Sequence, residues 1–150
     1  RYINLKGRDN ARTPMQWNDT ENAGFTTGTP WFTVNPNYKQ INVAEQEKDP
    51  DSILNFYRKL IRMRKEYPII VYGSYKLLYP DHKTAFVYER ILGNEKLLVA
   101  CNFSEDDLQL KAPDEFAENR AELLIGNYPE TEISDQLLLR PYEAKVYLIK

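Results

Sequence analysis

The chain has 150 residues, of which 42% are hydrophobic and 28% charged, a composition typical of a globular protein of one or two small domains. The formal net charge of -2 argues against nucleic acid or an anionic membrane as the main partner. No apolar run approaches the roughly 18 residues that a membrane-spanning helix needs. We therefore expect neither a nucleic-acid-binding protein nor a membrane protein, and residues 1–6 resemble no signal peptide.

Residues 1–48 lack hydrophobic periodicity and are rich in Gly, Pro, Asn, Asp and Thr, which predicts long irregular structure. A segment of this length without regular structure is usually functional or disordered. Its aromatic content favours a functional loop over a disordered tail. The aromatic residues concerned are Trp17, Phe25, Trp31, Phe32 and Tyr38.

Residues 50–65 have the pattern of a helix. Asp49 is a candidate N-cap, Pro50 suits the first helical position, and Pro68 prevents the helix from continuing. Apolar residues span an arc of roughly 180°, whereas a one-sided surface helix needs a stripe of about 100°. We therefore expect this helix to have neighbours on two sides.

Beyond Tyr67 the sequence changes to strand patterns, so a domain boundary is expected near residues 66–73. Gly93 and Asn94 form a good hairpin turn between the second and third expected strands. Turn signals at intervals of about 8–12 residues predict an antiparallel sandwich. The seven expected strands are residues 74–79, 84–91, 96–103, 107–111, 121–125, 136–140 and 145–149.

The residue types that usually perform catalysis or bind metals are scarce or poorly placed. His82 is the only histidine and Cys101 the only cysteine, so neither a zinc constellation nor an internal disulfide can form. Cys101 lies in an apolar run and is interpreted as a buried structural thiol, consistent with a reducing, cytoplasmic location. His82 is interpreted as an exposed turn residue, and the acidic run 105–107 as a turn rather than a catalytic pair.

Residues 7–17 combine groups that recognise polar ligands. Arg8 and Arg12 flank Asp9 and Asn10, and an apolar segment that ends at Trp17 follows. Guanidinium forks can bind vicinal sugar hydroxyls, and an indole can cover the apolar face of a sugar ring. From the residues alone, the alternative is an Arg–Asp pair that fixes the loop, because Asp and Asn in loops usually stabilise turns.

Residues 8–17 resemble a segment of the α-amylase family of glycoside hydrolases, in its oligo-1,6-glucosidase and dextran glucosidase branch. The resemblance continues in order along nearly the whole chain, although residues 104–138 match only loosely. Because family members are several times longer, it implies that the chain corresponds to their last part. The further matching segments are residues 22–25, 30–31, 34–38, 41–43, 49–53, 57–61 and 139–144.

This resemblance implies a mainly β fold, with a C-terminal antiparallel Greek-key β-sandwich domain at residues 71–150. Residues 1–70 would be the last loop and helix of a truncated (β/α)8 barrel. In that arrangement residues 1–48 are the loop after barrel strand eight. The helix at residues 50–65 is the last barrel helix, between the barrel and the C-terminal domain.

The resemblance also implies a function, that of a retaining α-glucosidase acting on α-1,6 links of short gluco-oligosaccharides without metal or other cofactor. None of the 22 Asp and Glu residues resembles the catalytic carboxylates of the family, so the chain is expected to be inactive alone. Arg8 matches a substrate-binding arginine, and Asp9 and Arg12 are candidates for orienting its loop. For Trp17 and Trp31, packing against the barrel is favoured over contact with sugar.

Three alternatives stay open at this point. One is a related sucrose isomerase or transglycosylase, whose distinguishing residues lie mostly upstream of this chain. Another is a free-standing carbohydrate-binding module. The third, preferred for residues 71–150, is a purely structural domain. The expected partners are an α-glucan oligosaccharide for the longer enzyme and a second copy for the isolated chain, through the apolar side of the helix at residues 50–65.

Overall fold

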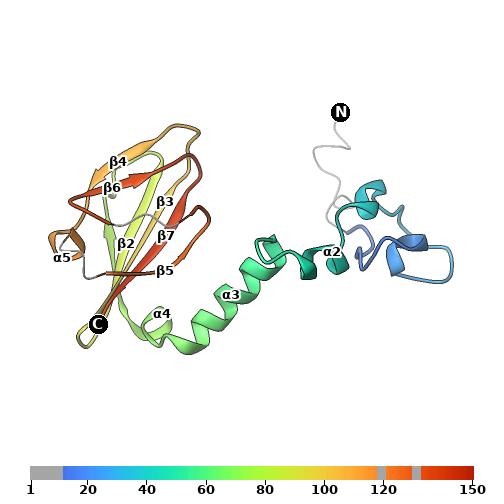
Figure 1. Cartoon of the computed structure of the whole chain (residues 1–150), viewed down its shortest axis with the longest axis horizontal. Helices are drawn as coiled ribbons and strands as arrows, with labels where there is room; N and C mark the ends of the chain where they lie inside the picture. The colour runs from blue at the N-terminus through green and yellow to red at the C-terminus, as the bar shows by residue number, and fades with distance from the viewer. Residues whose placement is uncertain (1–11, 118–120, 130–132) are drawn as a thin grey trace. The chain divides into compact units, whose positions relative to one another are not determined.

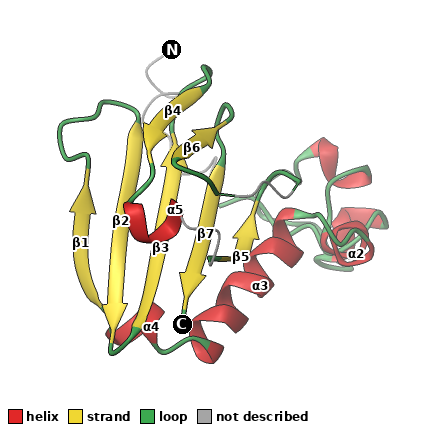
Figure 2. Ribbon diagram, turned by 60° about the vertical axis from the view of Figure 1, so that its left-hand side comes forward, coloured by secondary structure: helices red, strands yellow, loops and turns green. Residues whose placement is uncertain are grey.

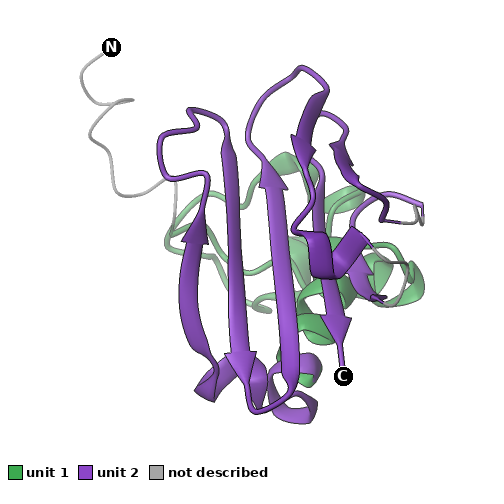
Figure 3. Cartoon of the chain, turned by 90° about the vertical axis from the view of Figure 1, so that its left-hand side faces the viewer, with its two compact units in different colours: residues 1–62 green, residues 63–150 purple. Residues whose placement is uncertain are grey.

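The structure is a computed structural model of the chain and describes residues 12–117, 121–129 and 133–150 (Figure 1). Within these ranges, helices dominate up to residue 72 and strands dominate afterwards (Figure 2). The chain divides into two compact units, residues 1–62 and residues 63–150 (Figure 3).

The described residues of the second unit form seven strands in two antiparallel sheets (Figure 2). The larger sheet has the order β1-β2-β3-β7-β5, and the smaller sheet pairs β4 with β6. Every predicted strand is present, with its ends within one residue of the prediction, and Gly93 and Asn94 form the turn between β2 and β3. The strands are β1 (Ser74–Leu78), β2 (Ala85–Leu92), β3 (Glu95–Asn102), β4 (Leu108–Lys111), β5 (Glu122–Gly126), β6 (Gln136–Leu139) and β7 (Ala144–Ile149).

The connections of these strands confirm the Greek-key sandwich. After the meander β1-β2-β3, the chain crosses to the smaller sheet as β4 and returns to the edge of the larger sheet as β5. It crosses again as β6 and comes back as β7, which inserts between β3 and β5. Both crossings let each sheet cover the apolar face of the other.

The main core lies between the two sheets. Because side chains alternate along a strand, Val87 and Leu98 point into this core while their neighbours Phe86 and Val99 point to the outer face of the larger sheet. A four-residue helix that the sequence analysis did not predict, α5 (Asp114–Ala117), adds the buried Phe116. The buried core residues are Val87, Leu98, Ala100, Leu110, Ala112, Phe116, Ile133, Leu137, Leu139 and Tyr147.

A second cluster covers part of the outer face of the larger sheet. The short helix α4 (Ile69–Tyr72) places the fully buried Ile69 against Leu97 of β3 and Leu148 of β7. This helix was not expected from the sequence pattern. Pro68 prevents α3 (Ile53–Glu66) from continuing, as expected, but it also stands at the N-terminus of α4.

Arg90 of β2 fixes the end of α4 to the sheet. Its Nε donates to the carbonyl oxygen of Ile69 at 3.0 Å, and its Nη2 donates to the carbonyl oxygens of Gly73 at 2.8 Å and Val71 at 3.3 Å. A Cβ at Gly73 would lie 2.6 Å from the same Ile69 oxygen, so the close approach requires glycine. The guanidinium thus adds to the hydrogen bond that the Ile69 carbonyl already accepts from the Gly73 amide, and it also binds carbonyls at the C-terminal end of the short helix.

Replacement of Arg90 by alanine is expected to lower the free energy of unfolding by about 2–3 kcal/mol, because hydrogen bonds to a charged donor are lost from a partly buried site. Arg90→Lys should recover only part of this loss, since an ammonium group lacks the planar fork whose Nε and Nη2 donate to separate carbonyls. Urea titration followed by circular dichroism measures the effect. Arg64→Ala, at an exposed position of α3, is the control, and equal destabilisation by both variants would contradict the assigned role of Arg90.

The start of α3 corrects one prediction. The helix begins at Ile53, and Ser52, not Asp49, is its N-cap: the Ser52 Oγ accepts a hydrogen bond from the Asn55 amide at 3.2 Å. Asp49 instead accepts from the Asp51 amide at 2.9 Å in a preceding turn. Ser52 Oγ also donates to the Gln46 carbonyl at 2.6 Å. This contact holds Ser52 at the cap position and favours a helix that begins at Ile53 and not at Pro50.

Candidate functional site in the first unit

The described part of the first unit contains short helical segments separated by turns. They are η2 (Glu21–Gly24), η3 (Pro36–Lys39), α2 (Val43–Lys48) and the first turns of α3. The sequence pattern predicts irregular structure here, and α2 was not expected from it. Of the predicted site residues, Arg8 and Asp9 lie outside the described residues, while Arg12 is described and exposed.

The end of the predicted sugar-binding motif, residues 16–17, is held from two sides. The Trp17 amide donates to the Ala23 carbonyl at 2.9 Å. On the other side, the Val43 amide donates to the Gln16 carbonyl and the Ala44 amide to the Trp17 carbonyl, both at 3.0 Å. These backbone hydrogen bonds position residues 16–17 between η2 and α2.

The η2 turn has unusual backbone geometry. Asn22, Ala23 and Gly24 are consecutive residues with φ of 52°, 58° and 66°. A left-handed conformation costs a non-glycine residue roughly 1–2 kcal/mol, so surrounding contacts must hold this turn. Asn22 Nδ2 donates to the carbonyls of Thr26 and Gly28 at 3.3 and 3.1 Å, and Ala23 is fully buried.

Polar side chains also hold the junction of α2 and α3. The buried Asn42 caps α2, since its Oδ1 accepts from the Glu45 amide at 3.0 Å and its Nδ2 donates to the Tyr38 carbonyl at 2.9 Å. Gln46 Oε1 accepts from the Leu54 amide at 3.1 Å. The conformation of this region therefore depends on specific hydrogen bonds.

The described part of the first unit has almost no apolar core of its own. Across residues 12–62, the buried residues are Pro14, Ala23, Asn42 and Ser52. Large apolar side chains are exposed instead, up to 93% for Trp31 and 82% for Ile53. The others exposed in this range are Met15, Trp17, Phe25, Ile41, Tyr57, Leu60 and Ile61. Exposed apolar groups at this density are typical of a surface that contacts another part of a protein.

A hollow of about 510 Å³ lies within this unit. Three of its polar side chains are already engaged: Gln16 donates to the Ile41 carbonyl, Asn42 caps α2 and Gln46 accepts from the Leu54 amide. A sugar site needs polar groups that converge on the ligand, whereas this hollow suits apolar side chains of a neighbouring segment. Its lining residues are Thr13, Pro14, Met15, Gln16, Ile41, Asn42, Val43, Gln46, Ile53, Leu54 and Tyr57.

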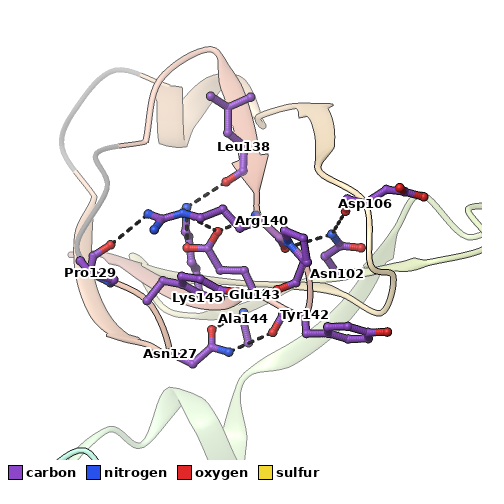
Figure 4. Close-up of polar contacts among 12 residues, drawn as sticks. Asn102, Asp106, Asn127, Pro129, Leu138, Arg140, Tyr142, Glu143, Ala144 and Lys145 are labelled. Atoms are coloured by element: carbon purple, nitrogen blue, oxygen red, sulfur yellow. Dashed lines mark hydrogen bonds and ion pairs between the residues drawn. The ribbon is translucent and has the colours of Figure 1, made fainter.

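In the second unit, buried charges gather at the turn between β6 and β7 (Figure 4). Glu143 is 1% exposed and Lys145 is 4% exposed, and Lys145 Nζ lies 3.1 Å from Glu143 Oε1. Lys145 Nζ also donates to the Leu138 carbonyl at 2.8 Å, and Glu143 Oε2 accepts from the Arg140 amide at 2.7 Å. The pair thus connects the end of β6 to the start of β7.

Two asparagines complete this turn (Figure 4). Asn102 Nδ2 donates to the carbonyls of Asp106 at 2.7 Å and Arg140 at 3.0 Å. Asn127 Nδ2 donates to the carbonyl of Tyr142, whose φ is 54°, at 2.9 Å. The contacts are internal, so the residues here stabilise the sandwich. Sequence reasoning missed this cluster, although a Glu and a Lys two residues apart beside an apolar strand were a usable signal.

The other candidate residues have structural roles. Cys101 is half-buried on β3, and burial raises the pKa of its thiol, which disfavours the nucleophilic thiolate. His82 is exposed in the turn before β2, where its Nδ1 accepts from the Ala85 amide at 3.0 Å. Residues 105–107 form the predicted turn. Within the described ranges, no three His, Cys, Asp or Glu side chains form a group suited to a metal ion.

Comparison with known families matches both parts of the chain. Residues 1–73 match the family described as "Alpha amylase, catalytic domain", and residues 75–146 match "Maltogenic Amylase, C-terminal domain". The two matches meet at the connection between α4 and β1. The chain belongs to the α-amylase family of glycoside hydrolases.

Individual relatives agree with this assignment. The chain is 53% identical to an oligo-1,6-glucosidase of Parageobacillus thermoglucosidasius over 99% of its own length and 27% of that protein. It superposes on a trehalose-6-phosphate hydrolase of Bacillus licheniformis with a TM-score of 0.89 and 43% identity, covering 99% of this chain and 27% of the other. The chain thus spans about a quarter of the length of these relatives.

A third relative has a different activity. A mutant isomaltulose synthase of Erwinia rhapontici, solved with its natural substrate sucrose, matches with a TM-score of 0.84 and 44% identity over 95% of this chain and 26% of that protein. The fold of this segment is therefore shared by relatives that differ in substrate.

None of the helices within the described ranges has the length and apolar character required to cross a membrane.

Proposed function

We propose that the chain is the C-terminal part of a retaining α-glucosidase that hydrolyses α-1,6 links of short gluco-oligosaccharides, and that this part is itself non-catalytic. The observation that supports this most is the 53% identity to an oligo-1,6-glucosidase along essentially the whole chain. In this proposal residues 1–70 complete the catalytic barrel and residues 71–150 form the C-terminal domain. The exposed apolar residues of the first unit support its assignment to a larger domain.

Arg8 is proposed as the substrate-binding residue of this segment, with Asp9 and Arg12 orienting its loop. A guanidinium can donate two parallel hydrogen bonds to vicinal hydroxyls of the non-reducing glucose. The hydrogen bonds that hold residues 16–17 would give the end of this loop a defined position. Trp17 and Trp31 are proposed to pack against the barrel and not against sugar.

The 150-residue chain alone is expected to show no glycosidase activity. Retaining hydrolysis requires two carboxyl groups roughly 5–5.5 Å apart, and this proposal places both in the upstream part of the longer enzyme. Incubation with isomaltose or p-nitrophenyl α-glucoside, followed by glucose or p-nitrophenol detection, should give the buffer rate. Activity that co-purifies with the chain through two further columns would disprove this assignment.

The isomaltulose synthase similarity favours one alternative, a sucrose isomerase or transglycosylase. Supplying the full-length protein with isomaltose and sucrose separately distinguishes the two. Free glucose from isomaltose supports the hydrolase, whereas conversion of sucrose to an isomeric disaccharide supports the isomerase. The same experiment tests the proposed partner, an α-glucan oligosaccharide.

A cytoplasmic location is also proposed, supported by the single unpaired cysteine.

The isolated chain is expected to self-associate. Ile53, Leu60 and Ile61 of α3 are exposed, and each would gain on the order of 1.5–3 kcal/mol from full burial. Met63, in contrast, is buried and does not belong to this exposed surface. Sedimentation at micromolar concentration should show a dimer or larger species, and Ile53→Ser/Leu60→Ser should shift it to monomer. A monomeric wild-type chain would contradict this expectation.

A further inference from the structure

We propose that the left-handed turn at residues 22–24 is a positioning element, which fixes the backbone of Trp17 and Asn18 and thereby orients the proposed sugar-binding loop that carries Arg8. This inference rests on the proposed function, which assigns Arg8 to substrate binding. It adds residues that do not touch sugar themselves and act through Arg8. The turn consists of Asn22, Ala23 and Gly24, with φ of 52°, 58° and 66°.

The carbonyl of Ala23 connects this turn to the loop. It accepts hydrogen bonds from two consecutive amides, that of Trp17 at 2.9 Å and that of Asn18 at 3.2 Å. The amide of Ala23 donates to the Thr20 carbonyl at 3.0 Å, so both backbone polar groups of this residue are engaged. Because Ala23 is fully buried, water cannot readily replace these partners. A change in the direction of this one carbonyl would therefore release both amides of the loop.

The left-handed conformation sets the direction of that carbonyl. A right-handed conformation at the same residues would turn the chain the opposite way. The left-handed one costs Asn22 and Ala23 roughly 1–2 kcal/mol each. A turn needed only to reverse the chain could use a common type I geometry without this cost. Strain of this kind is concentrated at functional sites, where a specific orientation matters.

Two contacts hold the strained turn in place. Asn22 Nδ2 donates to the carbonyls of Thr26 and Gly28 at 3.3 and 3.1 Å. A Cβ at Gly24 would lie 2.6 Å from Asn18 Oδ1, so the side chain of the loop residue occupies the space that glycine leaves. The same Oδ1 accepts from a backbone amide two residues further on at 3.0 Å, which limits its freedom to move away. The turn and the end of the loop are therefore fitted to each other by side chains as well as by backbone.

The opposite side of the loop end is bound to α2. The Val43 amide donates to the Gln16 carbonyl and the Ala44 amide to the Trp17 carbonyl. Trp17 is thus held through its amide by the turn and through its carbonyl by α2. Ligand-binding loops need supporting residues of this kind, because a binding group that is misplaced by a fraction of an ångström loses much of its effect.

A double-mutant cycle in the full-length protein tests this assignment. Asn22→Gly tolerates the left-handed backbone, so it should fold, but it lacks the donor to the carbonyls of Thr26 and Gly28 and loosens the turn. Its kcat/KM for isomaltose is expected to fall about tenfold, because misplacement of a binding group lowers the rate strongly. In an Arg8→Ala background the same substitution should change kcat/KM by less than about twofold, since residues that act through one group are not additive.

Asn127→Gly is the matched control. Asn127 Nδ2 also donates to the carbonyl of a residue with positive φ, Tyr142, but in a turn of the sandwich. This control should lower the melting temperature without changing kcat/KM in either background.

Hydrogen–deuterium exchange of peptides covering residues 12–18 gives a measurement that does not depend on activity. The amides of Trp17 and Asn18 should exchange about fivefold faster, or more, in Asn22→Gly than in the wild type or the control, since the turn that protects them opens more often. Asn22→Asp, which also tolerates the left-handed backbone and lacks the donor, is the second variant and should give the same pattern.

An equal loss of kcat/KM in both Arg8 backgrounds would overturn the proposal, because the turn would then affect the fold as a whole. Wild-type kcat/KM in Asn22→Gly and Asn22→Asp would overturn it as well. A wild-type protein inactive on isomaltose would disprove the proposed function, and exchange would then decide between two results. Faster exchange of residues 12–18 in the variants would support the positioning role of the turn, and unchanged exchange would overturn it.

Discussion

Replacement of Glu143 by glutamine is expected to lower the free energy of unfolding by roughly 3–5 kcal/mol, the range for breaking a buried ion pair from one side. Glutamine keeps the shape of the side chain and can still accept from the Arg140 amide. It removes the negative charge 3.1 Å from Lys145 Nζ. The Lys145 ammonium, 4% exposed, would then lack this carboxylate in a site from which water is excluded.

A double variant isolates the charge effect. Glu143→Gln/Lys145→Met removes both charges, so it should recover a substantial part of the stability that Glu143→Gln loses. Glu105→Gln, at an exposed position of the turn before β4, is the matched control and should change stability by less than about 0.5 kcal/mol. Urea titration measures all three. Equal stability of Glu143→Gln and the control would show that the pair contributes nothing measurable to folding.

In the full-length enzyme, Arg8→Ala is expected to reduce kcat/KM for isomaltose by about 10- to 100-fold, the equivalent of losing roughly 1.5–3 kcal/mol of charged hydrogen bonding. The loss should be larger if the contact strengthens in the transition state. Arg8→Lys should restore little activity, because an ammonium group cannot reproduce two parallel hydrogen bonds.

The control for this experiment is Arg64→Ala, which removes an exposed guanidinium from α3 and should leave kcat/KM unchanged. Circular dichroism of each variant verifies folding, so that a lower kcat/KM can be attributed to substrate contact. An Arg8→Ala enzyme with the wild-type kcat/KM would remove Arg8 from the site. Its role would then pass to a residue upstream of this chain.

The strands and the sandwich could be predicted because their signals are local. Alternating side chains, turn residues at regular intervals and the Gly93–Asn94 hairpin act within a few residues of each other. The substrate-binding assignment of Arg8 has a different basis. It came from family resemblance, and because Arg8 lies outside the described residues, it stays a prediction.

The positions of the seven described strands and the end of α3 could be predicted because they depend on local periodicity, turns and proline. The short helices α4 and α5 have too few residues for a periodic pattern, so they depend on tertiary contacts. Tertiary contacts also fix the cap of α3, through the contact of Ser52 with Gln46, and the partners of Arg90. Those partners are 17 to 21 residues away in sequence, and the pairing of β1 with β2 together with the packing of α4 on the sheet brings them within hydrogen-bond distance.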